Sequence, residues 1–218
     1  MTEPKRNGTR GPYAKSAQRS SDILDAATTV FATHGYSGGS LRDIARQLGL
    51  SLTGVMHHFG TKYELLEAVL ERADRTTSVN EDFDFDAACT ADGVASATLA
   101  RVRSNLERRE ILRLFAILSA ESSPSTHPAH DWFVDRYRRH SQELAAAFAY
   151  DQSVGRVRTD RDPQVLSRLL IGAWDGIQLQ WLIDPSFDMN EAMEAFFDWT
   201  IPESLATEQS TASISKSA

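Results

Sequence analysis

Apolar residues recur along almost the whole chain at spacings of three and four, and strictly alternating runs are nearly absent. Such spacing places apolar side chains on one face of an α-helix, whereas a half-buried strand needs a period of two. The sequence therefore predicts an all-α protein. Its 218 residues are enough for one or two domains with a substantial core.

Capping and stop residues divide the first third of the chain into short helices. Ser40, Ser51 and Thr61 are good N-cap residues, and Gly35 and Gly49 are good C-terminal stops. The helices expected from these signals cover residues 21–35, 40–48, 51–59 and 61–70.

Longer helical patterns fill the rest of the chain. Asp162 followed by Pro163 is the strongest start signal, because proline suits the first helical position. The polar ends, residues 1–19 and 202–218, are expected to be disordered. The longer helices are expected at 92–108, 110–122, 129–151, 162–183 and 188–199.

The charge of the chain is divided unevenly. The net charge is −7, yet residues 1–62 hold eight Lys and Arg against four acids, which leaves +4 there and −11 in the remainder. A basic N-terminal segment can meet phosphates, and an acidic body can serve another purpose. Chance asymmetry of an ordinary solvated surface is the alternative.

Residues 40–59 form a helix-turn-helix. Two short helices joined by a turn at Gly49 leave the second one projecting. An α-helix fits the major groove of DNA, and its N-terminal end presents free N–H groups toward phosphate. The pattern therefore predicts a DNA-binding element, with helix 51–59 as the recognition helix.

The segment ILDAATTVFATHGYSGGSLRDIARQLGLSLTGVMHHFGTKYELLEAVL, residues 23–70, strongly resembles the tetracycline-repressor (TetR) family. The shared motifs are HGY, S-L-R-D-I-A, G-L-S and H-H-F-x-x-K-x-x-L, in this order. The C-terminal half is similar only loosely, mainly in L-L-I-G-A-W-D-G-I-Q-L-Q-W-L. The resemblance implies a DNA-binding domain at 20–66, after a basic arm at 1–19. It also implies a helical regulatory and dimerisation domain at 67–201.

The resemblance implies DNA contacts on both helices of the motif. Many members carry an aromatic hydroxyl where this chain has Met56, and often a polar residue where it has Leu52. A leucine can touch a thymine methyl group but cannot read guanine. The positions that match the family's DNA contacts are Ser40, Arg42, Leu52, Thr53, Gly54, Met56, His57, His58 and Lys62.

Helical periodicity disagrees with part of this set. At 100° per residue, Leu52 and Met56 fall with the apolar side, whereas Thr53, Gly54, His57 and His58 fall on the other. The pattern alone thus places Leu52 and Met56 at the rim of the core, and whether they touch DNA stays open. We expect Thr53 and His57 to face the bases.

Basic residues around the motif have two interpretations each. Lys62 and Arg42 can bind phosphate or can be ordinary solvated surface residues, and a cation at the start of a helix opposes the helix dipole unless an anion is present. Lys5, Arg6 and Arg10 can follow the DNA backbone or belong to an ordinary disordered tail.

The regulatory domain carries two broad apolar stripes on the helices at 162–183 and 188–199. Gly172 and Gly176 share one face, where glycine would allow another helix to approach closely. We expect these helices to form a four-helix interface in a homodimer. The alternative is that both stripes build the core of one chain. The residues expected at the interface are Leu166, Leu170, Gly172, Ala173, Gly176, Ile177, Trp181, Met193, Phe196 and Phe197.

A small-molecule pocket is expected between the helices of this domain, although the same residues equally describe a plain core. The histidines His127, His130 and His140 do not match a metal-ligand spacing, so neither a metal nor a cofactor is expected. The candidate pocket residues are Phe115, Leu118, Trp132, Phe133, Tyr137, His140 and Trp174.

Other classes of protein are disfavoured by simple features. The chain shows no glycine-rich phosphate loop, nucleophile elbow or HExxH motif, so no enzymatic activity is expected. Cys89 lies in an acidic region expected to be weakly ordered, and as a lone cysteine it suits a reducing cytoplasm. A secretory signal and a membrane-spanning run are absent from the sequence.

The resemblance, taken with these features, implies a transcriptional repressor that a small-molecule effector releases from a palindromic double-stranded DNA operator. The alternative is a DNA-binding adaptor or activator without a small-molecule inducer.

Overall fold

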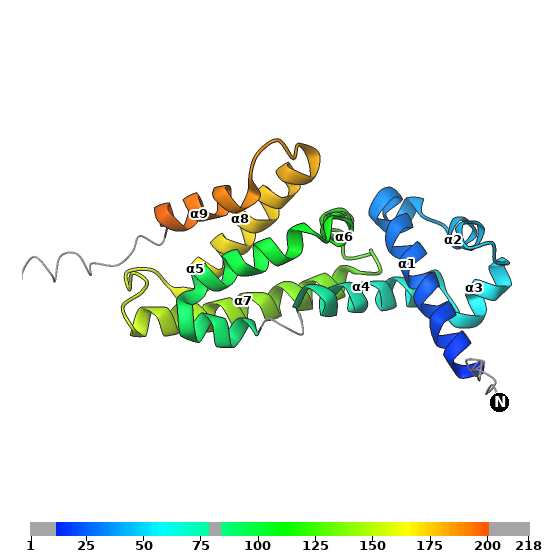
Figure 1. Cartoon of the computed structure of the whole chain (residues 1–218), viewed down its shortest axis with the longest axis horizontal. Coiled ribbons are helices and arrows are strands. Elements are labelled where there is room, and N and C mark those ends of the chain that lie inside the picture. The colour runs from blue at the N-terminus through cyan, green and yellow to red at the C-terminus, as the bar shows by residue number, and fades with distance from the viewer. Residues whose placement is uncertain (1–11, 79–83, 201–218) are drawn as a thin grey trace, which may run out of the picture.

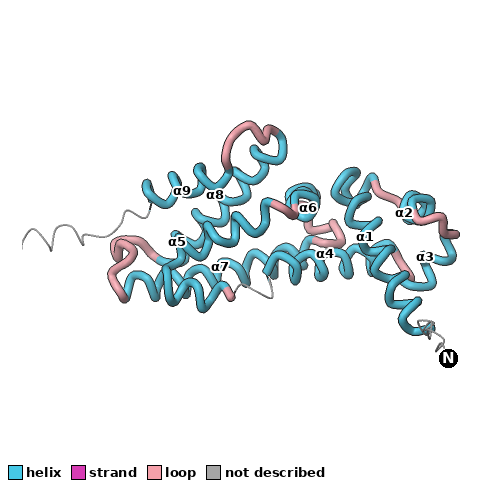
Figure 2. The backbone as a smooth tube through the Cα atoms, viewed as in Figure 1, coloured by secondary structure: helices cyan, strands magenta, loops and turns pink. Residues whose placement is uncertain are grey.

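The computed structural model describes residues 12–78 and 84–200, and within these ranges every regular element is a helix (Figures 1 and 2). The prediction of an all-α fold is confirmed. The helices are α1 (Pro12–Gly38), α2 (Leu41–Gln47), α3 (Leu52–His58), α4 (Lys62–Ser78), α5 (Phe85–Leu106), α6 (Arg109–Glu121), α7 (His130–Ser153), α8 (Pro163–Ile183) and α9 (Met189–Thr200).

The predicted caps start the short helices. The hydroxyl of Ser40 accepts a hydrogen bond from the Asp43 N–H at 3.2 Å, and Ser51 accepts one from the Gly54 N–H at 3.0 Å. The hydroxyl of Thr61 does the same for α4, accepting a hydrogen bond from the Glu64 N–H at 3.1 Å. Each bond satisfies a backbone donor that the first helical turn leaves free, so these starts are fixed locally.

Glycine interrupts the helical path at both predicted positions, ending α2 at Gly49 but only kinking α1 at Gly35. Gly35 has φ 68° and Gly49 has φ 64°, a left-handed conformation that costs glycine little and other residues more. The break at Gly35 separates the last residues of α1 from its main body. The chain can therefore turn sharply into α2 and again into α3.

Two helices begin earlier than expected. Helix α1 starts at Pro12, so residues 12–19 are helical rather than disordered, and Ser21, where the first helix was expected to begin, lies inside it. Proline suits the first turn, and the Ala, Lys, Gln and Arg residues that follow are good helix formers. Residues 1–11 and 202–218, including Lys5, Arg6 and Arg10, lie outside the described residues.

Helix α5 also extends further back, to Phe85, because Asp84 caps it through the Ala87 N–H at 3.0 Å. The expected start near residue 92 coincides instead with a kink at Gly93, which has φ 88°. Cys89 is consequently buried in a helix rather than weakly ordered, and burial raises the pKa of its thiol to about 12. Such a thiol is unreactive.

Two apolar cores hold the helices together. The first joins α1–α4 to one side of α6 and α7, and the second joins α5, α7, α8 and α9. In Figure 1, α1–α3 form one end of the molecule, α9 lies toward the other, and α6 and α7 lie between. The first core thus crosses the expected domain boundary at 66–67, since α1 packs closely on α6.

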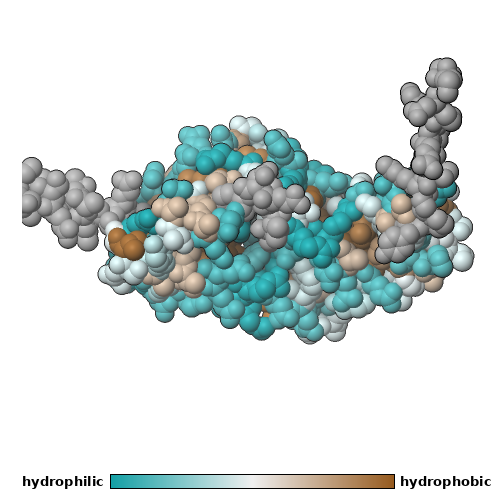
Figure 3. Space-filling model, turned by 60° about the horizontal axis from the view of Figure 1, so that its bottom comes forward, coloured by the Kyte–Doolittle hydropathy of each residue, from teal (hydrophilic) through white to brown (hydrophobic). Residues whose placement is uncertain are grey.

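The surface is mixed in polarity. The face in Figure 3 is largely hydrophilic, with apolar patches toward both ends. Within residues 12–78 and 84–200, no helix is long and apolar enough to cross a membrane.

Candidate nucleic-acid interface and internal cavity

Helix α3 lies at the outer end of the molecule (Figure 1), and Val55 is its one fully buried side chain. Val55 is fully buried in the first core, whereas Thr53 and His57 are exposed. Gly54 is half-buried and its N–H is held by Ser51. The exposed pair expected to face bases therefore lies on the accessible side of the recognition helix.

Periodicity placed Met56 at the rim of the core, but the structure leaves this side chain exposed to solvent. Its side chain is 44% exposed, and Leu52 is half-buried. Helix α3 has only two turns and buries only Val55 fully, so Met56 on its other side stays exposed. Met56 is thus exposed together with Thr53 and His57 and can contact DNA beside them.

His58 packs back on α1 instead of facing outward with His57. Its Nδ1 lies 3.0 Å from the hydroxyl of Ser20, and the ring is half-buried. This contact fixes the angle between α1 and α3. His58 is therefore better placed to hold the recognition helix than to read bases.

The remaining residues expected to contact DNA differ in whether their side chains already make contacts within the protein. Arg42 is exposed, whereas the hydroxyl of Ser40 both donates to the Asp43 carboxylate and accepts from the Asp43 N–H. The Lys62 ammonium lies 4.2 Å from the centroid of the Tyr36 ring, and burial lowers its pKa. The aromatic face holds this cation at the first turn of α4, next to the motif.

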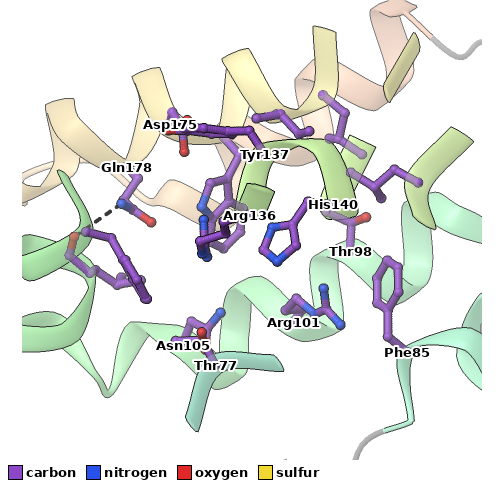
Figure 4. Close-up of a pocket in the computed structure, with 16 residues that line it drawn as sticks. Thr77, Phe85, Thr98, Arg101, Asn105, Arg136, Tyr137, His140, Asp175 and Gln178 are labelled. Carbon is purple, nitrogen blue, oxygen red and sulfur yellow. Dashed lines mark hydrogen bonds between the residues drawn. The ribbon is translucent and has the colours of Figure 1, made fainter. Parts of the chain in front are cut away.

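A cavity of about 110 Å³ lies between α5, α6, α7 and α8 (Figure 4). Its walls combine apolar and aromatic side chains with polar groups, as small-molecule sites do. Four of the seven expected pocket residues line it, namely Phe115, Tyr137, His140 and Trp174.

The other three expected pocket residues do not line this cavity. Leu118 and Phe133 are buried in the first core, and Trp132 packs against that core while stacking on Phe115 at 6.1 Å between ring centroids. Helices α6 and α7 each have two buried faces, and these residues lie on the face toward α1 and α4. The sequence pattern does not separate the two faces.

Polar residues of the cavity wall were missed by the sequence analysis. Asp175 and Gln178 project from α8, opposite Arg101 and Asn105 on α5 (Figure 4). A signal for the α8 pair did exist, because both interrupt the broad apolar stripe of residues 166–182. Nothing comparable marks the α5 pair, since they meet the cavity only through tertiary packing.

Most charges around the cavity are already satisfied. The Tyr137 hydroxyl donates to Asp175 at 2.8 Å, and burial raises the pKa of both groups, that of Tyr137 to about 12. Arg136 pairs with Asp74 of α4 at 2.9 Å. Burial, followed by the nearby Arg136 charge, lowers the pKa of His140 to about 3, so its ring is neutral at neutral pH.

The expected dimer residues divide into two groups. Leu166, Leu170, Met193 and Phe197 are buried in the second core of this same chain, as the alternative interpretation held. The remaining members are exposed or half-buried, namely Gly172, Ala173, Gly176, Ile177, Trp181 and Phe196.

A neighbouring exposed face of α8 includes large apolar residues outside the expected interface set. Val165, Leu169, Leu179 and Ile183 are 49–77% exposed, which is unusual for four large apolar residues on one helix. A Cβ added at Gly172 or Gly176 would meet no other atom within 4 Å. No other helix among the described residues therefore packs closely against these two glycines. The broad stripe thus faces two ways, partly inward and partly outward.

The histidines near the start of α7 are held by local hydrogen bonds. Nδ1 of His127 lies 3.0 Å from the Ser122 hydroxyl, and Nδ1 of His130 lies 2.8 Å from the Ser122 carbonyl oxygen. Within the described ranges, no group of three or more His, Cys, Asp or Glu side chains could hold a metal ion.

A capped helix-turn-helix at one end and a cavity within a helical body define a helix-turn-helix transcriptional regulator. Residues 23–69 match the family described as bacterial regulatory proteins, tetR family. The match covers the helix-turn-helix and the parts of α1 and α4 that flank it.

Relatives extend the similarity into the helical body. The chain is 24% identical to the A-factor receptor protein of Streptomyces griseus over 168 residues, or 76% of this chain and 56% of that protein. It is 27% identical to the transcriptional repressor AcnR of Corynebacterium efficiens, over 71% of this chain and 77% of AcnR. The chain therefore spans little more than half of the first relative and about three quarters of the second.

One solved structure shows the same arrangement over nearly its full length. A transcriptional regulator from Saccharomonospora viridis, in complex with choline, has a TM-score of 0.69 and 25% identity. The match covers 85% of this chain and 98% of that one.

Proposed function

We propose that this protein is a homodimeric repressor that binds a palindromic DNA operator and is released by a small molecule in the internal cavity. The observation that carries the proposal is the coexistence of an exposed recognition helix with a polar-lined cavity about 110 Å³ in volume. As a regulator of transcription it would act in the cytoplasm, and it would have no enzymatic activity.

On DNA, α3 enters the major groove with Thr53, Met56 and His57 outermost. Thr53 and His57 offer hydrogen bonds to base edges, and Met56 offers an apolar contact such as a thymine methyl group would accept. Exposed Arg42 and half-buried Lys62 are placed to meet the phosphates on either side.

Dimerisation uses the outward face of α8. Val165, Leu169, Gly172, Gly176, Leu179 and Ile183 follow one another at steps of four, three, four, three and four residues. This is the spacing of a helix–helix seam, and the two glycines at its middle allow a partner helix to approach closely. A two-fold axis at this seam would place two recognition helices on successive half-sites.

The cavity is connected to the DNA-binding helices by two routes. Arg136 lines the cavity and holds Asp74 of α4, the helix that continues from the recognition helix. Helix α6 lines the cavity with Leu112 and Phe115, and near its other end Glu121 accepts the N–H of Tyr36. A ligand that shifts α6 or α7 would therefore move α4 and change the spacing of the two recognition helices.

The alternative is an adaptor whose helical body binds a protein and no small ligand. A filled core would favour the adaptor, whereas the cavity supports ligand sensing. That the S. viridis relative was solved with choline adds support, because its fold is similar over most of the chain.

The proposal is tested by blocking the cavity. Thr98→Phe would place a ring in the cavity, and Ser96→Phe, on the exposed side of the same helix, is the control. Operator duplexes are first obtained by selection from random DNA, and compounds that release the protein from them are then identified by fluorescence anisotropy. The blocked protein should bind operator like the parent but lose its release. Equal release of the blocked and control proteins would contradict a ligand site here.

A further inference from the structure

One cation in the wall of the cavity lacks a partner. The guanidinium of Arg101 lies over the Phe85 ring, 3.8 Å from its centroid, on a part of α5 that faces inward. Among the described residues, no carboxylate oxygen lies within 4.0 Å of its nitrogens, and its buried Nε has no hydrogen-bond partner. Glu143 and Asp86 act on it only from farther away.

The other charges of the wall cannot neutralise Arg101. Asp74 is shared by Arg136 and Arg139, at 2.9 and 2.8 Å, and Asp175 accepts the Tyr137 hydroxyl. His140 is neutral, so it adds no positive charge of its own. The cavity therefore has an excess of positive charge at Arg101.

Two deeply buried polar groups flank this cation on the same face of α5. Thr98 is 6% exposed and Asn105 is 4% exposed, and both line the cavity. The Oγ1 of Thr98 and the Oδ1 of Asn105 are buried without any hydrogen-bond partner. Buried polar atoms are nearly always paired, so this row of three points to a polar group of a bound molecule.

We infer that the cavity binds a small organic anion, a carboxylate with one ring or a short chain, whose carboxylate pairs with Arg101. Thr98 would donate to a carboxylate oxygen, and the Asn105 oxygen would accept from a hydroxyl or amine substituent. The apolar part would lie against Phe115 and Trp174. Guanidinium and carboxylate match in planar, two-bond geometry, and a dry site strengthens the pairing.

The size of the cavity limits the ligand. Its volume is about 110 Å³, less than the cavity of about 150 Å³ that is known to admit benzene, so a short-chain carboxylate fits more readily than one with a ring. The charge separates this site from that of a choline-binding relative, because a quaternary ammonium group would be repelled by Arg101. This inference deepens the proposed function by giving the chemical class of its effector.

Matched pairs of compounds test the charge. Benzoate is compared with benzamide, and hexanoate with hexanamide, by isothermal titration calorimetry on the full chain, with choline as a cation. Quenching of tryptophan fluorescence gives a second readout, since Trp174 lines the cavity. Each carboxylate should bind about tenfold or more tightly than its amide, as expected for a charge-assisted pair.

Variants assign the preference to Arg101. Arg101→Gln should bring each acid and amide within about threefold of one another, Arg101→Lys should retain part of the preference, and Arg113→Gln, at an exposed site on α6, should retain all of it. Circular dichroism confirms that each variant is folded. Equal binding of acids and amides by the parent, preference for choline, or absence of carboxylate binding at millimolar concentration would overturn the inference.

The outcome for the inference can be separated from that for the proposed function. Carboxylates that bind through Arg101 yet leave the operator complex intact would support the anion site and contradict its role as an effector site. Release by uncharged or cationic compounds alone would support ligand gating and overturn the anion site.

Discussion

The carboxylate of Glu121, at the C-terminal end of α6, accepts a 2.6 Å hydrogen bond from the backbone N–H of Tyr36, at the junction of α1 and α2. The two residues are 85 positions apart, and the bond joins the helical body to the DNA-binding helices. The Tyr36 ring in turn holds Lys62 at the start of α4. One carboxylate thus fixes the position from which both α2 and α4 begin.

Removing this carboxylate should loosen the junction. Glu121→Ala leaves a partly buried N–H without its charged acceptor, so the free energy of unfolding should fall by about 1–3 kcal/mol. Urea denaturation measures the change. Glu110→Ala, at an exposed position in the first turn of α6, is the control and should change stability far less. Similar losses of stability in both variants would show that the hydrogen bond between Glu121 and the Tyr36 N–H contributes little to the free energy of unfolding.

Substitutions in the DNA-binding helices should separate base reading from phosphate binding. Lys62→Ala should weaken binding to all duplexes alike and reduce the slope of log K against log salt by about one. His57→Ala should instead change which bases are preferred. Anisotropy titrations at several salt concentrations, on the selected operator and on point-changed duplexes, measure both effects. Unchanged binding in either variant would remove that residue from the interface.

The outward face of α8 should control the oligomeric state. Leu169→Glu places a charge in the middle of the seam beside Gly172, where it would be buried in a dimer, so the protein should become monomeric and bind operator more weakly. Val134→Glu, at a 40% exposed position of α7, is the matched control. Analytical ultracentrifugation gives the result. A Leu169→Glu protein that stays dimeric would place the interface elsewhere.

Acid should destabilise the protein through His140. Burial, with the Arg136 charge second, lowers the folded-state pKa of His140 to about 3, against about 6.5 in an unfolded chain. As pH falls below that unfolded value, the unfolded state takes up a proton that the folded state refuses. Stability is therefore lost as pH falls through this window, at about 1.4 kcal/mol per pH unit.

His140→Gln removes this contribution. Between pH 6.5 and 4.5, the variant should lose about 2–3 kcal/mol less stability than the parent. Urea denaturation at each pH measures the difference. Equal losses in parent and variant would show that the ring is protonated in the folded protein.

The helix-turn-helix was predictable from sequence because its determinants are local. Ser40 and Ser51 cap helices through bonds three residues away, and Gly49 adopts the one backbone conformation that its position needs. The exposure of Met56 and the packing of His58 on Ser20 were not predictable in this way. Both depend on how α3 sits against α1, which periodicity within α3 does not encode.

The helical body was predictable as a set of helices but not as a set of surfaces. Leu166 and Val165 are adjacent in a stripe whose apolar residues all look alike, yet one is 4% exposed and the other 50%. A helix that packs both on its own chain and on a partner carries two apolar faces. In the sequence, the residues of these two faces form one broad apolar stripe and cannot be told apart. Arg101 and Asn105 were missed because only the tertiary packing of α5, which contacts α6, α7 and α9, brings them to the cavity.

Selection of binding sites from random duplex DNA tests the central claim most directly, because any operator sequence can be enriched from such a pool. The full chain should enrich a palindrome whose half-site centres lie about one helical turn, or 34–36 Å, apart. Two chains should bind each selected duplex, and Thr53→Ala should enrich a different half-site. Failure to enrich any sequence, or enrichment of a site without two-fold symmetry, would contradict a dimeric helix-turn-helix regulator.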